Sequence, residues 1–200
     1  MGKGEIKLIT ALKKVGFRTT GIYDLFNRKT LPSEAVQVIL QLFPEVYKDH
    51  RGHGGDLLRS LIAAEEPFDP APLIEFFEDG YFNKVVMWTV GHVIAVSKTT
   101  DISNWLKHQL LKEYATFERA SLVQALPLKG GFRNSKELIV VLKKIYDKYP
   151  IEVLELLKKH GTIDDIAFLQ EKLKPVMRPE AKDVEKLIAR LEKKAVSKKK

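Results

Sequence analysis

The residues best suited to hold a metal ion lie in one short loop, Asp49-His50-Arg-Gly-His53-Gly-Gly-Asp56. Imidazole nitrogens and carboxylate oxygens are suitable ligands for zinc and other transition metals. The loop has no third histidine nearby, and its glycines would not hold the ligands in place. Asp56 also suits the N-cap of a following helix. We therefore predict a mobile polar loop without a metal, and we expect no cofactor.

A second group of residues has the chemistry to bind an acidic protein or a nucleic acid. It combines basic, aromatic and histidine side chains on expected helices: Arg59, Lys84, Trp88, His92, Arg119, Lys158, Lys186 and Arg190. A ladder of basic side chains favours phosphate groups or an acidic protein. Four glutamates on the same helices can neutralise it: Glu118, Glu152, Glu155 and Glu185.

Composition narrows the class of protein. The 200 residues carry a net charge of +8, and five lysines lie in the last eight residues, so the basicity is largely that of a solvated tail. The absence of cysteine excludes disulfide frameworks, cysteine-ligated zinc and thiol nucleophiles. No apolar run approaches the roughly 20 residues of a membrane-spanning helix, and the start lacks the apolar stretch of a signal peptide. We expect a cytoplasmic monomer that does not enter a membrane.

The elements that position these residues have a helical period. Val36, Ile39, Leu40 and Phe43 follow the i, i+3, i+4, i+7 spacing of a helix that begins near Ser33 and ends at the loop from residue 49. Residues 84–96 contain enough β-branched side chains for a strand, but the length of the segment favours a helix. A loop is expected at 127–134. The other expected helices are 57–64, 73–78, 102–112, 116–125, 135–149, 151–159, 163–173 and 180–194.

The expected helices form pairs that recur along the chain. Pairs begin near Pro32, Pro72, Ile102, Ser135 and Ile163, at steps of 28 to 40 residues. No pair can bury its apolar face alone, so neighbouring pairs must stack. The pattern predicts an all-α solenoid of about five helix pairs. We expect a single domain over 1–194, with an N-terminal helical cap over 1–31 and a basic disordered tail over 195–200.

Three segments carry a family resemblance. They are Ile22-Tyr-Asp-Leu-Phe-Asn, Trp88-Thr-Val-Gly-His-Val-Ile-Ala, and the unit Gly161-Thr-Ile-Asp-Asp-Ile-Ala-Phe-Leu continued by Arg178-Pro-Glu-Ala-Lys-Asp-Val-Glu. They resemble HEAT repeats of bacterial proteins. The resemblance implies a right-handed α-solenoid of about five HEAT-like helix pairs whose second helices line a concave side. Such solenoids serve many functions as generic binding surfaces.

The resemblance favours a function without catalysis. We expect a protein–protein interaction module, an adaptor or scaffold or an immunity-type protein of bacteria, that uses its curved helical surface. The alternative is a solenoid that binds nucleic acid through the basic residues of the concave helices. Some HEAT-like DNA glycosylases combine aromatic side chains with a catalytic carboxylate, and Asp101 lies between Trp88 and Trp105. Tryptophans in helices more often pack in the core, so we do not expect an enzyme.

Overall fold

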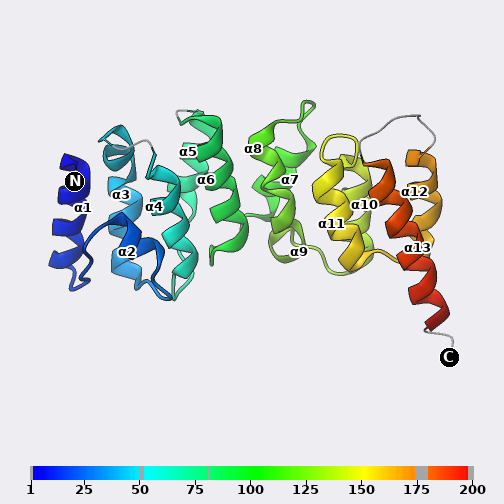
Figure 1. Cartoon of the computed structure of the whole chain (residues 1–200), viewed down its shortest axis with the longest axis horizontal. Helices are drawn as coiled ribbons and strands as arrows, with labels where there is room; N and C mark the ends of the chain where they lie inside the picture. Colours follow the sequence, from blue (N-terminus) through cyan, green and yellow to red (C-terminus); the bar gives the residue numbers. More distant parts are fainter. Residues whose placement is uncertain (1, 50–51, 81, 174–179, 198–200) are drawn as a thin grey trace. The chain divides into compact units, whose positions relative to one another are not determined.

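The computed structural model describes residues 2–49, 52–80, 82–173 and 180–197. Throughout this part the chain is helical, and its only β-type pairings are two isolated bridges. Figure 1 labels the helices in chain order. The chain divides into two compact units. Unit 1 comprises Met1–Ile102 and Phe117–Ala125, and unit 2 comprises Ser103–Thr116 and Leu126–Lys200.

The helices of unit 1 pack in a repeating order. They are α1 (Lys3–Lys14), α2 (Ile22–Phe26), α3 (Ser33–Asp49), α4 (Gly54–Ser60), α5 (Ala71–Asp79), α6 (Lys84–Val96) and α8 (Phe117–Ala120). Helix α2 packs on α4, α4 on α6 and α6 on α8. Helix α1 packs on α3, and α3 and α5 pack on their own partners, α4 and α6. Their buried faces form the core of this unit, with Leu8, Phe43 and Ile94 fully enclosed.

Two glycines allow helices of unit 1 to cross closely. At Gly4 on α1, an added Cβ would lie 3.0 Å from the carbonyl oxygen of Glu45 on α3. At Gly91 on α6, it would lie 2.1 Å from the hydroxyl of Ser121 and 3.2 Å from the carbonyl oxygen of Glu118. Any side chain at either position would push the two backbones apart.

Short backbone bridges tie successive pairs together at the ends of their helices. Leu31, which precedes α3, donates to the carbonyl of Ala63 at 2.7 Å and accepts from Glu65 at 2.9 Å. Phe68, which precedes α5, makes the equivalent bonds with Lys98 and Thr100 after α6, both at 3.2 Å. These bonds give hydrogen-bond partners to backbone N–H and C=O groups that would otherwise lack them beside the helix ends.

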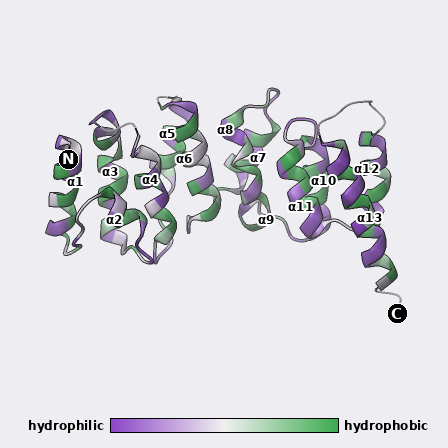
Figure 2. Ribbon diagram, in the orientation of Figure 1, coloured by the Kyte–Doolittle hydropathy of each residue, from purple (hydrophilic) through white to green (hydrophobic). Residues whose placement is uncertain are grey.

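Unit 2 is built from the remaining helices. They are α7 (Ser103–Leu111), α9 (Leu126–Lys129), α10 (Ser135–Ile145), α11 (Pro150–His160), α12 (Ile166–Leu173) and α13 (Ala181–Ser197). Helix α7 packs on α9 and α10, α10 packs on α11, and α13 packs on both α11 and α12. In Figure 2, hydrophobic and hydrophilic stretches alternate along α13, as an amphipathic helix packed on one side requires.

Sequence signals placed several helix boundaries correctly. Helix α6 covers 84–96, as its length predicted. Pro150 occupies the first turn of α11. Thr162 and Asp165 form the expected capping box, in which the backbone N–H of Thr162 donates to Asp165 at 2.8 Å.

Other expectations were wrong in detail. Asp56 is not an N-cap, because α4 begins at Gly54 and places Asp56 in its first turn. The loop expected at 127–134 begins as helix α9. Helix α13 continues to Ser197, three residues into the segment expected to be a tail, and residues 198–200 lie outside the described part of the chain. The third expected pair is divided, since α7 packs within unit 2 and α8 packs on α6 in unit 1.

Candidate interaction surface

A group of aromatic rings lies on α6 and α8 in unit 1. The imidazole of His92 stacks on the indole of Trp88, with ring centroids 5.2 Å apart and an interplanar angle of 9°. The ring of Phe117 on α8 stacks on the same indole, at 6.4 Å and 29°. We call Val85, Trp88, His92 and Phe117 the aromatic surface.

The spacing along α6 explains why these side chains share one face. Val85, Trp88 and His92 stand three and four residues apart, and side chains at those spacings lie above one another on a helix. Gly91 allows α8 to approach on the adjoining side of α6, and this close crossing brings Phe117 over Trp88. The sequence therefore folds locally so that two helices supply one patch.

The patch leaves apolar side chains in solvent. Val85 is 68% exposed and Phe117 is 58% exposed, while Trp88 and His92 are half-buried beside them. Single exposed apolar residues are ordinary on protein surfaces, but neighbouring ones mark sites where another molecule binds. Aromatic side chains in particular supply much of the energy at protein interfaces.

Arg59 adds a positive charge beside the patch. It projects from α4, which packs against α6, and its guanidinium donates to the carboxylate of Asp56 at 3.2 Å. Burial lowers the pKa of His92 below its ordinary value of 6.5, and the charge of Arg59 lowers it further. The Nδ1 atom of His92 is buried and makes no hydrogen bond within the described structure. His92 is therefore neutral at pH 7, beside a permanently charged arginine.

The structure distributes the predicted binding residues between the two units. Five belong to unit 1: Arg59, Lys84, Trp88, His92 and Arg119. Three belong to unit 2: Lys158, Lys186 and Arg190. Trp88 stacks on His92, and the charge of Arg59 acts on His92. Lys84 stands one turn before Trp88 on α6, and Arg119 follows Phe117 on α8.

Acidic neighbours neutralise part of the predicted basic ladder. Lys158 pairs with Glu155 at 2.5 Å and Lys186 pairs with Asp183 at 3.5 Å, as Arg59 pairs with Asp56. In all three pairs the acid stands three residues earlier on the same helix, a spacing that brings the two side chains together. Of the glutamates that the sequence singled out as neutralising, Glu155 does so directly.

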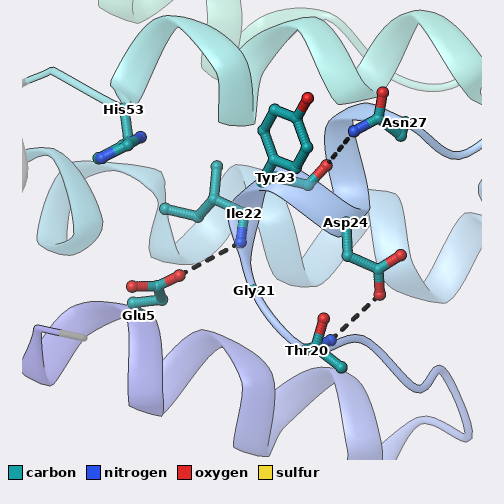
Figure 3. Close-up of a pocket in the computed structure, with 8 residues that line it drawn as sticks. All are labelled: Glu5, Thr20, Gly21, Ile22, Tyr23, Asp24, Asn27 and His53. Carbon is teal, nitrogen blue, oxygen red and sulfur yellow. Dashed lines mark hydrogen bonds between the residues drawn. The ribbon is translucent and has the colours of Figure 1, made fainter.

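A separate cavity of about 590 Å³ lies near the N-terminus (Figure 3). Glu5 from α1, His53 before α4 and the segment from Thr20 to Asn27 line it. Its carboxylates already hold the backbone, since Glu5 accepts from the N–H of Ile22 at 3.2 Å and Asp24 accepts from that of Thr20 at 3.1 Å. The Thr20 N–H lowers the pKa of Asp24, assisted by Arg28 and opposed by burial. Both acids thus fix the start of α2, and neither is placed as a proton donor.

The loop examined for metal binding does not assemble a ligand set among its described residues. Asp49 accepts a short hydrogen bond from the N–H of Gly4, and Asp56 pairs with Arg59. His50 lies outside the described residues. Across the part of the chain that the structure describes, no group of three or more acidic or histidine side chains is arranged to hold a metal ion.

The residues considered for glycosylase chemistry are not in one unit. Trp88 and Asp101 belong to unit 1, and Trp105 belongs to unit 2. Asp101 is exposed. A catalytic carboxylate of that type is expected to be buried enough for its pKa to shift.

Sequence reasoning identified Trp88, His92 and Arg59 but missed Phe117 and Val85. Both are ordinary apolar residues of amphipathic helices, where burial is the first expectation. A helical projection would have placed Val85 on the face of Trp88 and His92, away from the buried Val86, Val90 and Ile94. No local signal identified Phe117, because its position depends on the crossing of α8 over Gly91.

Comparison with family models, with curated proteins and with solved structures finds no match. None of the helices in the described ranges is both long enough and apolar enough to cross a membrane.

Proposed function

We propose that this chain is a non-enzymatic protein–protein interaction module, an adaptor or scaffold, and that the aromatic surface is where a partner docks. One observation carries the proposal: Phe117 stacks on Trp88 and yet remains more than half exposed, and Val85, one turn before Trp88 on α6, is exposed as well. Folding alone does not require large apolar side chains to gather in solvent, and covering them with a partner removes that surface from water.

We further propose that the fold is a right-handed HEAT-like α-solenoid of about five helix pairs. The succession of α2, α4, α6 and α8 within unit 1 supports this, because each contacts the next as second helices do in a solenoid. The backbone bridges at Leu31 and Phe68 support it too, since they recur at equivalent points of successive pairs. In this arrangement the aromatic surface lies on the layer of second helices.

A capture experiment tests the interaction proposal. Tagged wild-type protein and the variant Val85→Asp/Phe117→Ala are incubated with host lysate, with and without nuclease, and bound proteins are quantified by mass spectrometry. We expect a protein that binds wild type in stoichiometric amount, survives nuclease and is lost with the variant. Both substituted side chains are exposed, so the variant should fold, and circular dichroism checks that it does.

A matched control sharpens the result. Tyr23 is also an exposed aromatic residue of unit 1, at 77%, but it lies at the N-terminal cavity. Tyr23→Ala should capture the partner as well as wild type does. Equal capture by wild type and by the Val85→Asp/Phe117→Ala variant would refute a docking role for the aromatic surface.

A nucleic-acid-binding solenoid is the second candidate, favoured by the charge of unit 2. That unit has 21 Lys and Arg residues against 12 Asp and Glu residues, whereas unit 1 has 13 against 14. The pairing of Lys158 and Lys186 with acids weakens this candidate. A salt-dependent titration with DNA and RNA tests it, comparing wild type with Arg59→Ala/Arg119→Ala. Equal weak binding by both proteins would exclude specific binding through the predicted ladder.

A further inference from the structure

We propose that the aromatic surface binds an acidic peptide segment of its partner, with an apolar side chain of that segment against Val85 and Phe117 and a neighbouring carboxylate on Arg59. The inference rests on the proposed function, whose docking surface it shares. It goes further by stating the chemistry that the partner must carry.

Arg59 on α4 and Lys84 and Trp88 on α6 carry hydrogen-bond donors, and the acids of α4, α6 and α8 are Asp56, which is bonded to Arg59, and Glu118. Arg59 and Lys84 donate only, and so does the indole N–H of Trp88. The guanidinium of Arg59 has five N–H groups, and the structure uses one nitrogen for a single bond of 3.2 Å to Asp56. Its remaining N–H groups are free to take a second carboxylate. A partner that satisfies such a rim must supply acceptors, and a carboxylate supplies acceptors alone.

His92 contributes a further donor because of how it is packed. Its Nδ1 atom is buried without a hydrogen-bond partner, so a proton there would be a stranded buried N–H. The neutral ring therefore carries its proton on Nε2. Stacking on Trp88 fixes the plane of the ring, and with it the direction in which this N–H points.

The apolar part of the surface defines the second requirement. Val85, one turn before the half-buried Trp88, and Phe117, stacked on Trp88, present aliphatic and aromatic area rather than polar atoms. A purely acidic segment would leave this area in water. An apolar side chain placed beside a carboxylate covers it and pairs with Arg59 at the same time.

The charge of unit 1 favours a peptide over a nucleic acid. Its 13 basic residues are offset by 14 acidic ones, so it lacks the net positive field with which proteins hold a phosphate backbone. One arginine with unused N–H donors and one neutral histidine can bind one or two carboxylates. They do not suit a chain of phosphates.

A peptide selection tests the inference. The full-length protein is immobilised and used to select peptides from a random library displayed on phage. The selected sequences are compared with those selected by the Arg59→Glu variant. The matched control is Arg28→Glu. Arg28 is also in unit 1, has similar exposure (42% against 37%) and also pairs with an acid a few residues earlier in the chain, Asp24.

We expect wild type and Arg28→Glu to select peptides that join Asp or Glu to an aromatic or aliphatic residue. Arg59→Glu should lose the acidic preference, and selected peptides should bind it roughly tenfold more weakly or worse. Val85→Asp/Phe117→Ala should lose the apolar preference.

Each other outcome has a definite meaning. Peptides that require Phe117 but show no acidic preference, or a preference unchanged in Arg59→Glu, would overturn this inference and leave the proposed function standing. Failure of wild type to select any peptide above the Val85→Asp/Phe117→Ala variant would overturn both. Binding of a poly-dT oligonucleotide that Arg59→Glu abolishes and Arg28→Glu retains would also overturn the inference, in favour of a nucleic acid.

Discussion

The imidazole of His92 lies almost parallel to the indole of Trp88, one turn earlier on α6, with the centroids of the two rings 5.2 Å apart. Nδ1 of His92 is buried and has no hydrogen-bond partner in the described structure. Protonating the ring would therefore place a positive charge in a partly buried site that also feels the charge of Arg59. The stack belongs to the neutral form of the histidine.

The folded protein should lose stability at acidic pH because of His92. Its pKa in the folded state lies below the ordinary value of 6.5, so the unfolded chain binds the proton more readily. Stability from the neutral ring is complete above pH 6.5 and falls as pH drops below it toward the folded-state pKa. Urea unfolding at about pH 7.5 and about pH 5.5 should show a larger loss for wild type than for His92→Gln.

Asp56 is bonded to Arg59 and offsets part of its charge. Glu118 and Arg119 stand on α8, which packs against α6. An identical pH dependence in wild type and His92→Gln would show that His92 titrates as it does in the unfolded chain.

Gly91 should tolerate no side chain. An alanine there would place its Cβ 2.1 Å from the hydroxyl of Ser121 and 3.0 Å from the ring of Phe77, so α8 must move. We expect Gly91→Ala to lower the free energy of unfolding by about 1–3 kcal/mol, the usual cost of overpacking. Chemical denaturation measures it.

Gly55→Ala is the matched control, because a Cβ at this helical glycine meets neighbours only at 3.7 and 3.9 Å. It should be neutral or stabilising by up to about 1 kcal/mol. The double variant Gly91→Ala/Ser121→Ala should lose less unfolding free energy than the sum of the losses in the two single variants. Strict additivity would mean that the hydroxyl of Ser121 is not what excludes a side chain at Gly91.

Asp165 should be among the most sensitive acidic residues of unit 2. Its side chain is 5% exposed, accepts from the N–H of Thr162 and pairs with Lys143 at 2.7 Å. Asp165→Ala removes the helix cap and leaves the ammonium group of Lys143 without this partner, at a cost of about 3 kcal/mol in unfolding free energy. Asp183→Ala, which breaks an exposed pair of 3.5 Å, should cost less than about 1 kcal/mol. Similar losses for the two variants would contradict this ranking.

Lys129 should react with acylating reagents at lower pH than an ordinary lysine. Burial lowers its pKa to about 8 from 10.5, because the charged amine is partly removed from water. Trace acetylation over a pH series, read by mass spectrometry, should show its reactivity levelling off just above pH 8. In urea the burial is lost, and the reactivity of the same amine should keep rising toward pH 10.5. The same profile in folded and unfolded protein would contradict the lowered pKa.

Local signals predicted the elements that are specified locally. The length of 84–96, Pro150 in a first turn and the Thr162–Asp165 capping box each act over a few residues, and each is found. Asp56 was misplaced for an equally local reason. It can cap a helix or sit in the first turn, and the glycines before it allowed α4 to begin at Gly54, three residues before the expected start at 57.

The candidate site was only partly predictable. Trp88 and His92 could be paired from their spacing of four residues on one helix. Arg59 and Phe117 come from other helices, and their places depend on how α4 and α8 pack against α6. The close approach at Gly91 that sets the place of α8 has no signature in the sequence beyond one glycine in an apolar helix.

The path of the chain limits how the protein can be divided into pieces. Residues 103–116 belong to unit 2, and residues 117–125 return to unit 1 before the chain leaves it again. A break after residue 102 would give an N-terminal fragment without α8, and therefore without Phe117. A break after residue 125 would instead deprive the C-terminal fragment of α7. No single cut yields two intact units, so deletion mapping of a partner would misassign its binding region.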